Sequence, residues 1–214
     1  GGWAGAGTFT YGTSDLVMTG SGAKINYLDG EEVYKLSITG TVSLNGVDST
    51  SAALKPRYNL NFTGSASGTL ASTASEILEL DQTFRNNSAV FGFHGSGNHI
   101  ANLAKIQPTH TSGTISVPAC TTKVIDMTGS GGTTQATGDL TITTELEVGS
   151  GTTFTSNGNN ITALLVDNQA GGTFNLSEGD TLTFTDASGC GFGSSEGTFN
   201  SLGADGNENT VTSS

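Results

Sequence analysis

The sequence predicts an all-β chain, a parallel β-helix or β-solenoid with irregular insertions, and three observations lead to this prediction. Glycine supplies 32 of the 214 residues, about twice its usual share, whereas charged residues supply only 12%. Apolar residues alternate with Ser and Thr at a period of two in several segments. These segments recur with glycine-rich corners between them and no helical pattern. One or two antiparallel β-sandwiches, which need a similar strand spacing, are the alternative fold.

Internal similarity is the clearest of these signals. The pentapeptide MTGSG occurs at 18–22 and again at 127–131, and the chain has no other methionine. LSITGTVSL at 36–44 follows the first copy, and LTITTELEV at 140–148 follows the second. Apolar residues stand at matching positions in the two nonapeptides. We interpret MTGSG as a strand end and its turn, with the methionine as the last inward side chain.

Alternation assigns the individual strands. In 140–148 the apolar side chains fall on one face, and Thr141, Glu145 and Glu147 fall on the other. The segment 36–44 repeats this pattern. Further strands are expected at 58–62, 161–166, 174–176 and 182–184. Gly-Thr precedes each MTGSG, at Gly7 and Gly113, and looser repeat copies start with Gly-Thr at Gly172 and Gly197.

The repeat divides the chain into three parts. Residues 1–47 are predicted to form the first repeat unit, and 112–214 the second unit with the coils that follow it. Residues 48–111 are less regular and are expected to be an irregular insertion or divergent coils. Within them, 98–108 fits one short helix ended by its proline, or an irregular strand. The pattern still runs at the last residue, so we expect the repeat to continue beyond 214.

Charge excludes two classes of partner. The formal net charge is −12, and only seven Lys and Arg are spread over the chain. So few cations cannot neutralise a run of phosphates, so nucleic acid is not an expected partner. The same balance disfavours an anionic membrane surface, and no apolar stretch is long enough for membrane insertion.

Outward carboxylates raise the possibility of an enzyme. Glu145 and Glu147 lie on one side of a predicted strand, and Glu79 and Asp81 repeat that arrangement. Glycosidases use two carboxylates at a fixed separation. The competing interpretation is solvated charge that keeps sheet edges from pairing. We favour the second interpretation, because aromatic residues are scarce, and we assign no catalytic residue and no cofactor-binding residue.

Calcium is the one metal that the sequence suggests. Asp205, Asn207 and Asn209 place carboxylate and amide oxygens at alternate positions, as calcium loops do. Thr210 stands where such a loop needs glycine, so a polar turn is the competing interpretation. The acid-rich turn 29–32 is a second candidate.

Other motifs have simpler interpretations. His94, His99 and His110 lack the spacing of a zinc site. The segment 193–197 matches G-x-S-x-G by letters, but no helix pattern follows it. Cys120 and Cys190 are either two small buried side chains or a disulfide. N-glycosylation sequons start at Asn61, Asn86, Asn160 and Asn175.

The string GTFTYGTSDLVMTGSG at 7–22, followed by YKLSITGTVSLNG at 34–46, resembles degenerate repeats of large extracellular proteins. Such repeats occur in bacterial surface adhesins and in phage or viral fibres and spikes. The resemblance covers 7–46 and 112–214. It implies a right-handed parallel β-helix in a surface or virion appendage, with no catalytic residues to transfer.

The sequence therefore leads us to expect a structural or adhesive module of an extracellular, cell-surface or virion-surface fibre. Its expected partners are neighbouring subunits, further copies of itself and surface glycans. The alternatives are a carbohydrate-active β-helix enzyme, either a lyase or a glycosidase, and a calcium-ordered surface-layer domain. A fibre segment should have its chain ends at opposite poles, whereas an enzyme should have an acidic groove.

Overall fold

The computed structural model describes residues 3–4, 12–13, 15–20, 22–38, 40–62, 69–73, 75–80, 91–94, 100–108, 112–117, 119–186 and 197–213. These residues form twenty β-strands. They contain no helix that is long and apolar enough to cross a membrane. Every pairing between named strands is parallel. The predicted β-solenoid is therefore confirmed, and the alternative of antiparallel sandwiches is wrong.

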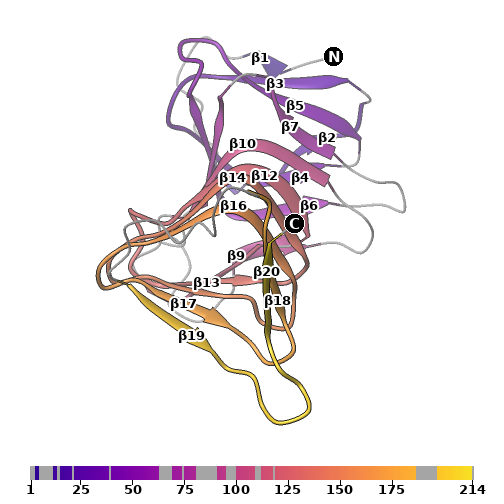
Figure 1. Ribbon diagram of the computed structural model, residues 1–214. Helices are drawn as coiled ribbons and strands as arrows, with labels where there is room; N and C mark the ends of the chain where they lie inside the picture. The colour runs from indigo at the N-terminus through magenta and orange to yellow at the C-terminus, as the bar shows by residue number, and fades with distance from the viewer. Residues whose placement is uncertain are drawn as a thin grey trace.

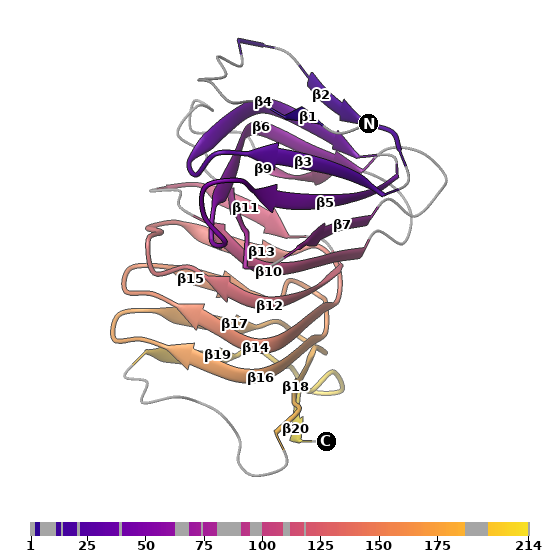
Figure 2. The ribbon, with the colours of Figure 1, turned by 90° about the horizontal axis from the view of Figure 1, so that it is seen from above.

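The strands stack into three ladders, which we call the first, second and third faces (Figures 1 and 2). The first face contains β1 (Trp3–Ala4), β3 (Ala23–Tyr27), β5 (Thr41–Gly46), β7 (Thr69–Ser72), the first halves of β10 (Ile100–Pro108), β12 (Cys120–Asp126), β14 (Leu140–Val148) and β16 (Ile161–Asn168), and then β18 (Thr181–Phe184) and β20 (Thr210–Ser213).

The chain passes from the first face to the second and third faces before it returns. The second face contains the first halves of β4 (Glu31–Ile38) and β6 (Ala53–Phe62), β8 (Ile77–Leu80), and the second halves of β10, β12, β14 and β16. The third face contains β2 (Asp15–Met18), the second halves of β4 and β6, β9 (Phe91–His94), β11 (Thr114–Val117), β13 (Thr133–Ala136), β15 (Thr153–Thr155), β17 (Thr173–Leu176) and β19 (Thr198–Ser201).

Local irregularities turn the chain at the corners inside long strands. The register shifts between Thr122 and Val124 in β12, and between Ile142 and Glu145 in β14. Extra residues of this kind bend a strand sharply. One continuous strand can therefore contribute its two halves to two faces.

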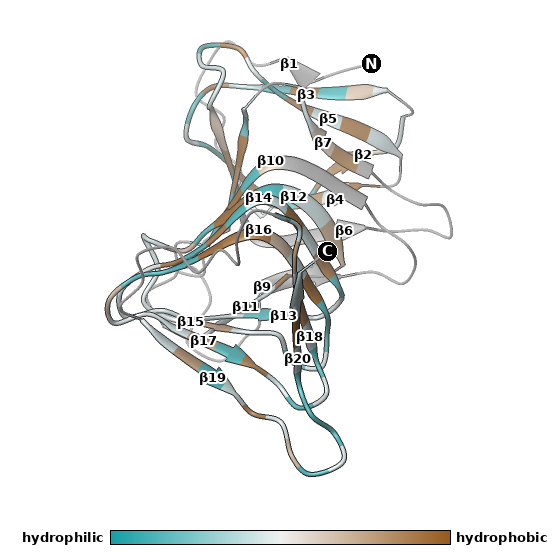
Figure 3. Cartoon of the chain, in the orientation of Figure 1, coloured by the Kyte–Doolittle hydropathy of each residue, from teal (hydrophilic) through white to brown (hydrophobic). Residues whose placement is uncertain are grey.

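Inward rows of apolar side chains form the core. Along β14, for example, the buried residues alternate with outward ones on each side of the bulge, and Figure 3 shows such alternation of hydrophobic and hydrophilic residues along the strands. On the third face Phe154, Phe174 and Phe199 stack on one another, with ring centroids 5.1 and 5.4 Å apart. Parallel register places identical inward positions directly above one another, so the core is a set of side-chain ladders.

The MTGSG motifs end strands, as the sequence predicted. Met18 is the last residue of β2, and Met127 directly follows β12; both side chains are buried. The two corners differ, however. Met18 leaves the third face and Met127 leaves the second face. The repeated pentapeptide therefore stands at two different corners of the solenoid and does not mark equivalent positions in two coils.

The segment 98–108 is not a helix. Its described residues form β10, whose Ile106 lies in register between Leu78 and Ile125. These three buried residues continue the inward row of the second face, so packing between coils overrides the helical spacing of the apolar residues. Strands β6, β7, β8 and β10, which lie within 48–111, belong to the same ladders as their neighbours on both sides.

Candidate functional site

An acidic row lies on the second face. Strands β12, β14 and β16 place Asp126, Glu147 and Asp167 in register on successive coils. Neighbouring strands are about 4.8 Å apart, so the three carboxylates form a column. Glu145 lies on the same outward side of β14, which confirms the predicted orientation of Glu145 and Glu147. We call these four residues the acidic row.

The pKa shifts differ in direction along the acidic row. Burial alone would raise the pKa of Asp126, but hydrogen bonds from Lys105 and Thr128, together with the Lys105 charge, lower it. The Lys105 Nζ lies 2.8 Å from Asp126 Oδ2. Burial and the neighbouring carboxylates raise the pKa of Glu145 and Glu147. The row thus pairs one firmly ionised aspartate with glutamates that protonate more readily than usual.

Replacement of Glu147 should reveal what it costs to bury its charge beside the other carboxylates. Because its pKa is raised in the folded state, the ionised carboxylate costs stability above that pKa, and the cost disappears as pH falls through it. Glu147→Gln should therefore raise the free energy of unfolding at neutral pH by about 0.5 kcal/mol, and the gain should shrink as pH falls through the raised pKa and be absent below the usual glutamate pKa of about 4.3. Urea unfolding at neutral pH and at a pH below the usual glutamate pKa measures the gain in stability. Exposed Glu208→Gln is the control, and a less stable Glu147→Gln protein at neutral pH would contradict the prediction.

The other carboxylates of interest lie elsewhere. Glu79 forms an ion pair of 3.0 Å with Lys55, and Asp81 lies outside the described residues. In the acid-rich turn, Asp29 Oδ1 accepts a hydrogen bond from the Ala53 backbone. Glu31, in the same turn, is buried and stands in register with the inward residue Leu54. Its Oε2 accepts a hydrogen bond from a backbone N–H of its own turn.

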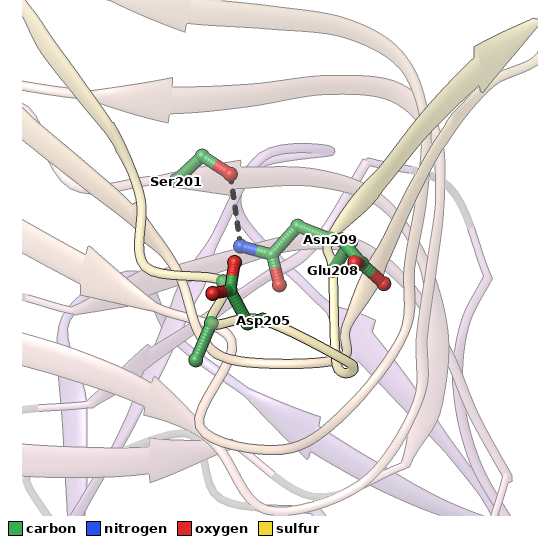
Figure 4. A pocket seen from close by; sticks show the side chains of 6 residues that line it. Ser201, Asp205, Glu208 and Asn209 are labelled. Carbon is green, nitrogen blue, oxygen red and sulfur yellow. Dashed lines mark hydrogen bonds between the residues drawn. The ribbon is translucent and has the colours of Figure 1, made fainter.

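The calcium candidates lie in the loop between β19 and β20, beside an open pocket of about 260 Å³ (Figure 4). Asp205 and Asn209 line this pocket, together with Glu208, which the sequence analysis missed. Asn207 does not line it, since its Nδ2 donates to Glu178 Oε1 of the preceding coil at 3.2 Å. The structure thus brings together two of the three predicted residues.

Asn209 is held in the pocket by its side-chain nitrogen. Asn209 Nδ2 donates to the Leu176 carbonyl at 2.8 Å and to Ser201 Oγ at 3.0 Å, and its buried Oδ1 has no partner. Across the described part of the chain, no group of three or more His, Cys, Asp or Glu side chains could hold a metal ion. Calcium binding in this loop therefore stays a prediction from the sequence.

The remaining motifs can be placed only in part. Cys120 is a free, buried thiol, and burial raises its pKa to about 12, as expected of an unreactive structural cysteine. Asn160 is exposed, and Asn175 is half-buried. His94 and Asn61 belong to β9 and β6, whereas His99, His110, Asn86, Cys190 and 193–196 lie outside the described residues.

Threonine forms the most regular outward feature, which the sequence analysis did not single out. On the third face, Thr114, Thr133, Thr153, Thr173 and Thr198 occupy one register position on successive coils. On the first face, Thr121, Thr141, Thr162, Thr183 and Thr212 do the same. The alternating threonines of LTIT, TLTFT and TVT carried this signal, but their alignment depends on the lengths of the corners.

No protein family, curated protein or solved structure matches this chain.

Proposed function

We propose that the chain is a structural and adhesive module of a long surface fibre, extracellular and displayed on a cell or virion, without catalytic activity. One observation carries the proposal. The first-face ladder runs without interruption from β1 to β20, and these strands lie at opposite ends of the stack (Figure 2). In such a stack each coil contacts only its neighbours, so the architecture suits a rod that extends along one axis.

The last coil also offers a surface for a neighbouring subunit. Val211 stands at the inward position of β20, in register with fully buried Leu182, yet it is 47% exposed. Leu202, in the adjoining loop, is 55% exposed. Apolar side chains at the open edge of a sheet favour pairing with another chain. This supports continued stacking along the axis, by a further coil of the repeat or by a neighbouring subunit.

A carbohydrate-active enzyme is the competing class, and the raised pKa values of Glu145 and Glu147 are the observation that favours it. A raised pKa is typical of a general acid. However, sugar-cleaving sites are usually concave, and the acidic row lies along a stacked outer sheet face. Burial, together with like-charge repulsion in the column, accounts for the raised pKa values without a catalytic role.

Two measurements on the purified chain test the proposal. Sedimentation velocity should show an elongated particle, and neutral and acidic polysaccharides should release no new reducing or unsaturated ends. Cleavage that disappears in both Glu145→Gln and Glu147→Gln would overturn the non-catalytic proposal. A compact particle would overturn the fibre proposal.

A further inference from the structure

The first face of the C-terminal coils carries a regular row of threonines. We define the threonine row as Thr121, Thr141, Thr162, Thr183 and Thr212, which are in register on five successive strands. Their spacing along the axis is that of neighbouring strands, about 4.8 Å. Each side chain is outward and either half-buried or exposed.

The threonine row also extends along the strands. Thr181 and Thr185 flank Thr183, Thr210 precedes Thr212, and all of these residues are at least partly exposed. Residues two apart in a strand point to the same side at a separation of about 6.6 Å. The repeat along the strands is thus present in β18 and β20, whereas Asp139, Asn160 and Leu164 stand at the corresponding positions beside Thr141 and Thr162.

The hydroxyls of the threonine row are available to a ligand. Within the described residues, those of Thr121, Thr141, Thr162 and Thr183 make no hydrogen bond to other protein atoms. The third face differs, because its second outward row is satisfied internally. There, Gln135 donates to Ser116 at 3.0 Å, and Asn200 donates to Asn175 at 2.8 Å. Within the described residues, the threonine row of the third face has a shorter stretch of free hydroxyls, because Thr114 and Thr133 have partners there and only Thr153, Thr173 and Thr198 have none. The first face thus carries the longer stretch.

We propose that the threonine row binds an ordered lattice of water, the surface of an ice crystal. Its axial repeat of about 4.8 Å is close to an oxygen–oxygen repeat of hexagonal ice. Threonine is stiff at χ1, so neighbouring hydroxyls keep their spacing with little entropy to lose on binding. The five side chains of the row are themselves uncharged, and the exposed charges nearest to them in the chain, Lys123 and Asp139, lie at its N-terminal end.

Neutral polysaccharide is the other partner with suitable hydrogen-bonding chemistry, and the observations favour it less. Small-molecule and sugar sites are concave and carry aromatic side chains. The large hydrophobic side chains that are exposed in the described chain are Val17, Val47, Leu202 and Val211, and none of them is aromatic. A row of hydroxyls and methyls has no platform on which a sugar ring can stack.

Ice growth is the direct test. The wild-type chain should lower the freezing point below the melting point and should inhibit recrystallisation of ice. Thr162→Lys puts a long charged side chain in the middle of the threonine row and should abolish both effects. Thr173→Lys places the same side chain at a half-buried position of the third-face row and should leave both effects intact. Circular dichroism melting curves confirm that both variants are folded, and Thr183→Lys repeats the test one coil away.

The outcomes are distinct. A wild-type chain without effect on ice, or an equal loss in Thr162→Lys and Thr173→Lys, would overturn the proposal. Retention of the wild-type chain on insoluble cellulose or chitin, lost in Thr162→Lys, would overturn it in favour of a glycan. The inference goes beyond the proposed structural role, and the sedimentation test of the rod can succeed or fail independently of it.

Discussion

Replacing Phe174 with alanine should destabilise the fold by about 3–5 kcal/mol. Phe174 is fully buried, and its ring lies between those of Phe154 and Phe199, at centroid distances of 5.1 and 5.4 Å. Removing it takes out the middle of a three-ring stack and leaves a cavity that the coils above and below cannot both fill. Equilibrium unfolding in urea measures the loss.

Thr173→Ala is the matched control, since it shortens the neighbouring outward side chain on the same strand. It should change the free energy of unfolding by only about 0.5 kcal/mol or less. If the two variants were equally destabilised, the inward assignment of Phe174 would be incorrect.

Gly149→Ala should destabilise the fold by about 1–3 kcal/mol, although alanine usually fits where glycine has no special backbone angle. A Cβ at Gly149 would lie 2.5 Å from Thr128 Cα and 2.9 Å from the Met127 carbonyl oxygen. Both contacts are to the backbone of the preceding coil, which cannot rotate away, so the two coils must separate locally. Thermal and urea unfolding measure the effect.

Gly129→Ala provides the comparison within the MTGSG corner itself. A Cβ at Gly129 would meet nothing within 4 Å. There the substitution should be neutral, or should stabilise the fold by about 0.4–1 kcal/mol through the unfolded state. Greater destabilisation in Gly129→Ala than in Gly149→Ala would show that the coils do not pack at this corner as described.

The alternation of apolar and polar residues was sufficient to predict strands and their buried sides. Leu140, Ile142, Leu146 and Val148 are all buried, as the period of two requires. The face to which a strand belongs could not be read in this way. The similar nonapeptides at 36–44 and 140–148 lie on different pairs of faces. Each face needs the same pattern, so sequence similarity does not identify equivalent positions in the coil.

Contacts between coils determine the side-chain positions that the sequence pattern could not predict. The side chain of Asn207 does not line the pocket at the predicted calcium loop, because it donates a hydrogen bond to Glu178 on the preceding coil. Ser37 is buried despite its outward position, because its hydroxyl donates to Asp15 at 2.9 Å. Thr141, Thr162 and Thr183 are evenly spaced in the chain, but Thr212 joins the row only because a longer connection separates it from Thr183. These partners lie about one coil apart in the chain, beyond the reach of local pattern.

The central claim is that successive coils stack in parallel register, and spin labels test it most directly. Cysteines at positions 153 and 173, in a background with Cys120→Ala and Cys190→Ala, carry nitroxides on facing positions of β15 and β17. Their Cα atoms should be about 4.8 Å apart, so the electron paramagnetic resonance spectrum should show strong spin–spin broadening. Labels at 153 and 198, two strands apart, should broaden much less. A spectrum of the 153/173 pair equal to the sum of its single-label spectra would contradict the stacked solenoid.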